Sequence, residues 1–162
     1  MIKYAKIVNE ETGLCEVGTG TNNSFYESIG MIELDVQQSD INNCWYLTEK
    51  CPMKTEEQKE LEERERIAKL TCTKRVFALM LQELGISYGM LKQLIATNEQ
   101  AQLEWDLCVE LQRSNPLLDV MALQLGITAE QLDGLFRYAN GEITIGQFRE
   151  LIPEPITENT EE

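Results

Sequence analysis

The segment Leu125-Gly126-Ile127-Thr128-Ala129-Glu130-Gln131 decides the fold of the C-terminal half of the chain. A glycine at this place ends a helix, because it readily adopts the left-handed backbone conformation of a helix C-terminus. Thr128 and Gln131 match a capping box, in which each side chain bonds the backbone amide of the other residue and a new helix begins. Leu84-Gly85-Ile86-Ser87 repeats the pattern 41 residues earlier. The sequence therefore predicts two similar helix-turn-helix-like units.

Start and stop signals of this kind divide residues 72–152 into several short helices and predict a multi-helix module. Pro116 follows Asn115, which is a strong signal for the first turn of a helix. The helix before it is expected to run from Glu99 to Arg113, because leucines recur there at four-residue steps. These leucines are Leu103, Leu107 and Leu111.

The first 52 residues predict a small β-rich module in the order ββαββ. Residues 2–8 and 14–17 alternate apolar and polar side chains about a glycine-containing connection, which is typical of a β-hairpin. Residues 24–29 are expected to form a short helix, and residues 32–36 and 44–47 to form two further strands. The predicted fold class is therefore α+β. A module of this size buries little of its surface, so residues 1–52 are expected to be unstable when produced alone.

Residues 53–71 are predicted to form an acidic connector helix between the two modules. Thr55 and Gln58 match a capping box, and the helix that follows is rich in Glu, Lys and Arg. Its apolar stripe is shorter than the three or four heptads of a coiled coil, so we expect a solvated helix and keep a homo-oligomer as the alternative. Residues 153–162, with two prolines and four glutamates, are expected to be a disordered acidic tail.

Composition limits the functions that the chain can have. Its net charge is −14, from 28 acidic and 14 basic residues spread along the sequence, which disfavours binding to nucleic acid or to an anionic membrane. The five cysteines include no CxxC pair and there is no histidine, so we predict neither a metal site nor a cysteine nucleophile with a histidine base. No phosphate-binding or hydrolase motif is present. We therefore predict a protein that is not an enzyme and has no catalytic residue and no cofactor.

The second helix-turn-helix-like unit resembles DNA-binding motifs at its packing positions. A recognition helix must enter a groove walled by phosphates, whereas residues 129–138 carry two acids and one arginine. We therefore expect this unit to pack helices together rather than to bind DNA. The chain also has no apolar run long enough to cross a bilayer and no signal peptide, so we expect it to stay in the cytoplasm where it is made.

Two pairs of adjacent aromatic residues form the candidate interaction surface. Phe25 and Tyr26 lie on the predicted short helix, and Trp45 and Tyr46 lie on the last predicted strand. Neighbouring side chains on a strand point to opposite faces, so one ring of a pair can be buried while the other meets a partner. A buried cluster built from one ring of each pair is the alternative that the sequence leaves open.

Residues 1–52 resemble small proteins of bacterial prophages and tailed phages that are encoded near tail-fibre and lysis genes. The resemblance is carried by segments such as Val17-Gly18-Thr19-Gly20-Thr21-Asn22 and Trp45-Tyr46-Leu47. Residues 74–141, especially Asn115-Pro116-Leu117-Leu118-Asp119, look similar to the helical part of such proteins. No catalytic residue comes with the resemblance, which implies a phage origin and work through protein contacts.

The resemblance favours a tail-associated virion component or a tail-fibre assembly factor, with other phage tail proteins as partners. It implies a location in the cytoplasm of the bacterial host, with incorporation into the virion tail as a further expectation. The alternative is a small acidic phage effector that binds and inhibits a host defence protein. Such an effector should gather its carboxylates on one face, whereas the sequence spreads them evenly.

Overall fold

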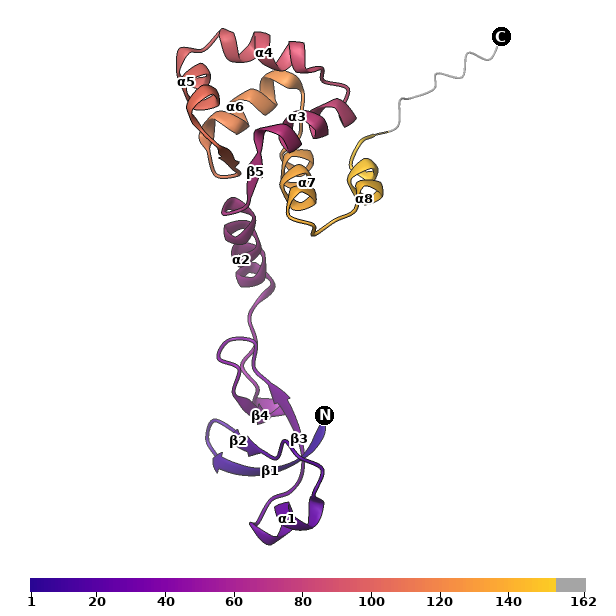
Figure 1. The fold of residues 1–162 in the computed structure, drawn as a ribbon. Helices are drawn as coiled ribbons and strands as arrows, with labels where there is room; N and C mark the ends of the chain where they lie inside the picture. Colours follow the sequence, from indigo (N-terminus) through magenta and orange to yellow (C-terminus); the bar gives the residue numbers. More distant parts are fainter. Residues whose placement is uncertain (154–162) are drawn as a thin grey trace, which may run out of the picture. The chain divides into compact units, whose positions relative to one another are not determined.

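The computed structural model describes residues 1–153, and the contacts within it divide the chain into two units (Figure 1). Unit 1 comprises Met1–Glu60 and unit 2 comprises Leu61–Glu162. The described residues combine α-helices with an N-terminal sheet, which confirms the mixed α+β class. The predicted disorder of residues 154–162 concerns a part of the chain that lies outside the described residues.

The strands of unit 1 close into a small antiparallel barrel in the order β1-β2-β4-β3. Its elements are β1 (Ile2–Asn9), β2 (Leu14–Val17), α1 (Asn23–Ser28), β3 (Ile32–Gln38), β4 (Trp45–Leu47) and the 3-10 helix η1 (Thr48–Lys50). Asn22 caps α1, because its side chain accepts a hydrogen bond from the Phe25 amide. The helix therefore begins one residue after a polar cap and lies between the second and third strands.

The core of unit 1 is thin. Its buried apolar side chains are Ala5, Cys15 and Val36. Half-buried side chains pack around them, namely Ile7, Val17, Leu34, Trp45 and Leu47. Because alanine and cysteine are small, this unit buries little apolar surface, and its stability depends on few side chains.

Unit 2 contains most of the helices. Its elements are the end of α2 (Glu56–Ala68), β5 (Thr71–Thr73), α3 (Lys74–Glu83), α4 (Tyr88–Ala96), α5 (Glu99–Leu107), β6 (Glu110–Gln112), α6 (Pro116–Leu125), α7 (Ala129–Ala139) and α8 (Ile145–Glu150). α7 and α8 each begin with a complete capping box, at Thr128 and Thr144. Gly126 ends α6 with a φ of +73°, in the left-handed region that glycine adopts readily.

The division between the units falls inside α2, after Glu60. α2 has no buried side chain, and Leu61 is 56% exposed, so the helix is solvated up to its last turn, where Ile67 and Ala68 are half-buried. The predicted module boundaries at residues 52 and 71 remain predictions.

The predicted helix from Glu99 to Arg113 is wrong. α5 ends at Leu107, and the residues after it form β6, which pairs with β5 in a two-stranded antiparallel sheet. The leucine spacing misled the prediction, because these leucines do not share one buried helix face. Leu107 is 78% exposed, whereas Leu111 is buried and lies on β6, opposite Cys72 of β5. α5 buries Ala101 and Trp105 instead, which also lie four residues apart.

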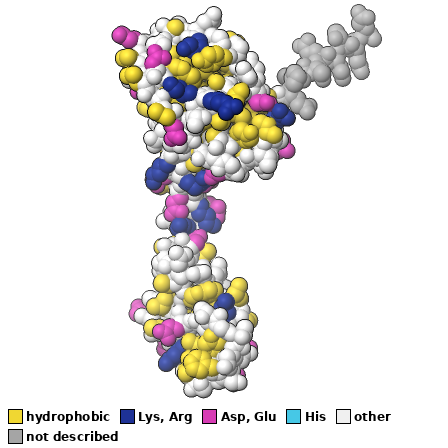
Figure 2. All heavy atoms as spheres, in the orientation of Figure 1, with side chains coloured by type: hydrophobic (Ala, Val, Ile, Leu, Met, Phe, Trp, Pro, Cys, Tyr) yellow, Lys and Arg dark blue, Asp and Glu magenta, His cyan; other side chains and the backbone are white. Residues whose placement is uncertain are grey.

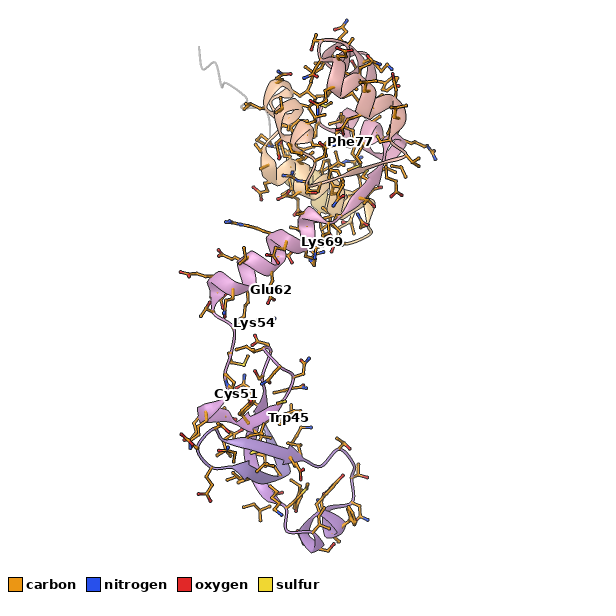
Figure 3. All side chains as sticks on the ribbon, turned by 90° about the vertical axis from the view of Figure 1, so that its left-hand side faces the viewer. Trp45, Cys51, Lys54, Glu62, Lys69 and Phe77 are labelled. Carbon is orange, nitrogen blue, oxygen red and sulfur yellow. The ribbon has the colours of Figure 1, made fainter. Side chains whose placement is uncertain are left out.

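The core of unit 2 is centred on α7, where Leu132, Leu135 and Phe136 are almost completely buried. The ring of Phe77, labelled in Figure 3, lies 6.4 Å from that of Phe136 and 6.3 Å from that of Trp105. These rings join α3, α5 and α7 into one hydrophobic core, which is much larger than the core of unit 1.

Candidate interaction surface

Tyr26 fixes α1 to the outer side of β1. Its ring stacks on that of Tyr4, with centroids 6.1 Å apart and an interplanar angle of 24°. The Tyr4 hydroxyl donates a hydrogen bond to the Glu27 carboxylate over 3.0 Å, and this bond raises the pKa of Tyr4 above its ordinary value. The Tyr4 side chain is therefore held at two places: its ring stacks on Tyr26, and its hydroxyl is hydrogen-bonded to the Glu27 carboxylate.

The glycine-rich loop after β2 closes around the same tyrosine ring. A Cβ on Gly18 would lie 2.6 Å from Cζ of Tyr26, which is closer than real Cβ contacts. The amide of Gly20 donates a hydrogen bond to the Tyr26 hydroxyl. The two glycines are therefore explained by the close approach of the loop backbone to Tyr26.

Phe25 lies next to this anchor and points outward, with 54% of its surface exposed. Its ring meets the Tyr26 ring in a T-shaped arrangement with centroids 5.7 Å apart. Ile29 follows four residues later, so it lies on the same side as Phe25, and it is 47% exposed. Figure 2 shows hydrophobic side chains gathered at the end of unit 1 that carries α1, and we call Phe25 and Ile29 the Phe25 surface.

Trp45 and Tyr46 lie elsewhere on the barrel. Trp45 is half-buried against the core of unit 1, and the ammonium of Lys3 lies 4.8 Å from its ring centroid (Figure 3). The Tyr46 hydroxyl accepts a hydrogen bond from the Asn42 side-chain amide over 2.9 Å. Among the described residues, no ring contact joins either side chain to Phe25 or Tyr26. The structure thus places Phe25 and Tyr26 in contact with each other but not with Trp45 or Tyr46.

Sequence reasoning missed Tyr4 and Ile29 as parts of this site. Tyr4 belongs to the outward-facing set of β1, and the alternation of that strand signals its orientation. The alternation does not signal that α1 covers it. Ile29 ends α1, and only its spacing from Phe25 marks it as a neighbour on the surface.

No group of three or more His, Cys, Asp or Glu side chains in residues 1–153 could hold a metal ion. Burial raises the pKa of the Cys72 thiol to about 11, so this thiol stays protonated and unreactive at neutral pH.

None of the helices in residues 1–153 combines the length and the apolar character that a membrane crossing requires. Comparisons with protein families, with curated proteins and with solved structures found no match to this chain.

We expect Gly18→Ala to destabilise unit 1 by about 1–3 kcal/mol, the usual cost of an extra methyl group in a tightly packed place. The added Cβ would overlap the Tyr26 ring, which Tyr4 prevents from moving away. Chemical unfolding followed by amide NMR signals of unit 1 measures the effect. In a Tyr26→Ala background the same change should cost less than about 0.5 kcal/mol, because nothing is left to overlap. An equal cost in both backgrounds would show that the ring is not the cause.

Proposed function

We propose that this chain is a non-enzymatic phage or prophage protein that acts by protein–protein interaction. Its role is that of a tail-associated structural component or a tail-fibre assembly factor. The observation that carries the proposal is the Phe25 surface, an exposed aromatic ring supported by a stacked and hydrogen-bonded tyrosine pair. Aromatic side chains are enriched among the residues that contribute most to protein interfaces.

The geometry of Phe25 suits it to this role. Tyr26 is held by Tyr4 and by the backbone at Gly18 and Gly20, so the support beneath Phe25 is fixed before a partner arrives. A side chain that is already ordered loses less conformational entropy on binding, and more of the contact energy then appears as affinity. Large exposed apolar groups are also unfavourable in water, which is consistent with a surface that is covered in use.

The tail-associated part of the proposal is supported by the resemblance of residues 1–52 to small phage proteins encoded near tail-fibre genes. In this proposal the ββαββ module is the docking module, since α1 interrupts the strands and presents Phe25. A homo-oligomer is compatible with the proposal, and the same surface could then contact a second copy.

The alternative role, a small acidic effector that inhibits a host protein, would need an uninterrupted acidic face. Basic side chains are interspersed among the glutamates of α2, where Arg66 pairs with both Glu63 and Glu142. In the helices that follow, Arg113 pairs with Asp119 and Asp133. These arginines interrupt the acidic surface at α2 and at α6 and α7, and this distribution favours the tail-associated role.

We infer that the helix-turn-helix-like unit formed by α6 and α7 serves packing and not DNA binding. The middle of α7 is buried from Gln131 to Phe136 except at Asp133. Asp133 accepts a hydrogen bond from Nε of Arg113 over 2.6 Å. A recognition helix needs a free face for base edges, and α7 uses its faces for the core of unit 2.

The proposal is tested with tagged protein recovered from cells in which the parent phage replicates. We expect tail-fibre or baseplate proteins to co-elute, and we expect Phe25→Ser combined with Ile29→Ser to reduce their recovery at least tenfold, as loss of an aromatic anchor of about 2 kcal/mol implies. The matched control is Ile41→Ser, which removes an isoleucine that is 53% exposed in the loop before β4. Purified virions are then examined for the protein, which separates a structural component from an assembly factor.

Recovery of a host protein together with absence from virions would contradict the tail-associated role and support the effector. Equal recovery of tail proteins by the Phe25 and Ile41 variants would leave the role standing but reject the Phe25 surface as the contact.

A further inference from the structure

Unit 2 carries a groove that differs in character from the rest of this acidic chain. It has a volume of about 460 Å³ and lies between α3, the start of α4 and α5. The side chains that line it are Lys74, Arg75, Ala78, Leu79, Gln82, Tyr88 and Trp105. The five α3 residues recur at three- and four-residue steps, so they form one face of the helix. The opposite face of α3 buries Phe77, Met80 and Leu81 in the core of unit 2.

The floor of the groove is apolar and accessible. Leu79 is 49% exposed and Tyr88 is 47% exposed, although the unit has a large core that could bury such side chains. Trp105 closes one wall and is itself mostly buried, so that wall is rigid. An apolar side chain of a partner could therefore lie against a preformed surface, which is how ligand grooves usually gain affinity.

The rim of the groove is positively charged. The Lys74 ammonium donates a hydrogen bond to the Trp105 carbonyl over 2.6 Å and lies 5.7 Å from the Trp105 ring centroid. The Lys92 ammonium lies 5.9 Å from the Tyr88 ring centroid, one helical turn along α4. Among the described residues no carboxylate forms an ion pair with Arg75 or Lys92, in contrast to Arg113 and Arg149. Figure 2 shows Lys and Arg side chains between hydrophobic ones over α3 and α4.

None of the side chains that line this groove within residues 1–153 is aspartate or glutamate, in a chain that has twice as many acidic as basic residues. An acidic segment would be attracted to the groove and repelled by much of the remaining surface. Such complementarity selects the partner and its orientation more than it adds affinity. The combination of a cationic rim and an apolar floor therefore selects a segment that carries both carboxylates and a large apolar side chain.

We propose that the groove between α3, α4 and α5 binds an acidic peptide segment of a partner protein, with an aliphatic or aromatic side chain of that segment placed against Leu79 and Tyr88. The site lies on unit 2 and does not depend on the Phe25 surface, so it stands or fails separately from the function proposed above. Single-stranded nucleic acid also combines negative charge with flat apolar groups. It is disfavoured because it binds along extended basic tracks, whereas here two cations line one short groove and a third lies beside Tyr88.

The test is a selection of random twelve-residue peptides, displayed as a library, on the purified full-length protein. We expect a consensus that contains Asp or Glu on both sides of a Leu, Ile, Phe or Trp. The best peptide is then synthesised with a fluorescent label, and its Kd is measured by anisotropy at low and moderate salt. The affinity should fall as salt rises, because exposed charges are screened.

Two variants and two matched controls locate the binding. Arg75→Glu and Leu79→Ser should each weaken binding at least tenfold. Lys69→Glu makes the same change of charge at an exposed lysine beyond α2, and Leu123→Ser removes a leucine that is 82% exposed on α6. Both controls should bind the peptide within about twofold of the unchanged protein. All four changes lie at partly or fully exposed positions, and circular dichroism confirms that each variant is folded.

A consensus without acidic residues, no enrichment, or equal losses in Arg75→Glu and Lys69→Glu would overturn the proposal. A labelled single-stranded oligonucleotide that binds more tightly than the peptide, and does so through Arg75, would assign the groove to nucleic acid instead. A consensus that matches a segment of this same chain would make a second copy the occupant and would also overturn the partner assignment.

Discussion

Replacing Phe136 with alanine is expected to lower the free energy of unfolding of unit 2 by about 3–5 kcal/mol. Phe136 is completely buried in the middle of α7, and its ring contacts that of Phe77 from α3. Removing the ring leaves a cavity between two helices and loses the transfer free energy of the aromatic group. Because small domains are stable by only about 5–15 kcal/mol, much of the population could unfold at moderate temperature.

The measurement is urea unfolding followed by the fluorescence of Trp105 in a Trp45→Phe background, since the chain has two tryptophans and they lie in different units. Leu123→Ala is the matched control. It removes an equally apolar side chain that is 82% exposed, and it should change the free energy by less than about 0.5 kcal/mol. A loss below about 1 kcal/mol for Phe136→Ala would show that α7 is not packed as the structure describes.

The helix boundaries of unit 2 could be predicted because they depend on local chemistry. Thr128 caps α7 by accepting a hydrogen bond from the Gln131 amide three residues away, and Asn115 caps α6 in a similar way. Both partners of such a bond lie within a few residues, so the sequence alone identifies them. Gly126 adds a stop signal of the same local kind.

The pairing of β5 with β6 could not be predicted, because its partners lie far apart in the sequence. Cys72 lies opposite Leu111, 39 residues later in the chain, and no turn sequence joins the two strands. Each strand has three residues, which is too short for alternation to be distinguished from the end of a helix. The leucine at position 111 fitted a helical spacing equally well.

The candidate interaction surface likewise has one part that the sequence predicts and another that depends on distant contacts. Residue type and position on the short helix marked Phe25 and Tyr26. Which of the two rings is half-buried depends on Tyr4 and on the loop at Gly18, and these contacts exist only because the barrel brings β1 and the end of β2 together. Trp45 could not be separated from them by sequence, because its burial depends on the closure of the same barrel.

Residues 1–55 produced alone are expected to lack a stable fold. This fragment keeps the whole barrel and also the hydrogen bond from the Lys54 amide to Asp40. Its core nevertheless consists of Ala5, Cys15 and Val36 with half-buried neighbours. A domain of about 60 residues buries only roughly 60% of its chain surface, and one with such small core side chains gains less than most.

The measurement is a comparison of amide NMR spectra of the fragment and of the full-length protein. We expect broad, poorly dispersed signals from the fragment, and the full-length spectrum shows whether the rest of the chain changes them. The control is Val36→Leu in the fragment, which adds one methylene, worth only about 0.8 kcal/mol when buried, and should therefore not restore dispersion. Sharp, dispersed spectra from the unaltered fragment would refute the expectation and would mean that the ring contacts of Tyr4, Tyr26 and Phe25 stabilise the barrel more than its small core suggests.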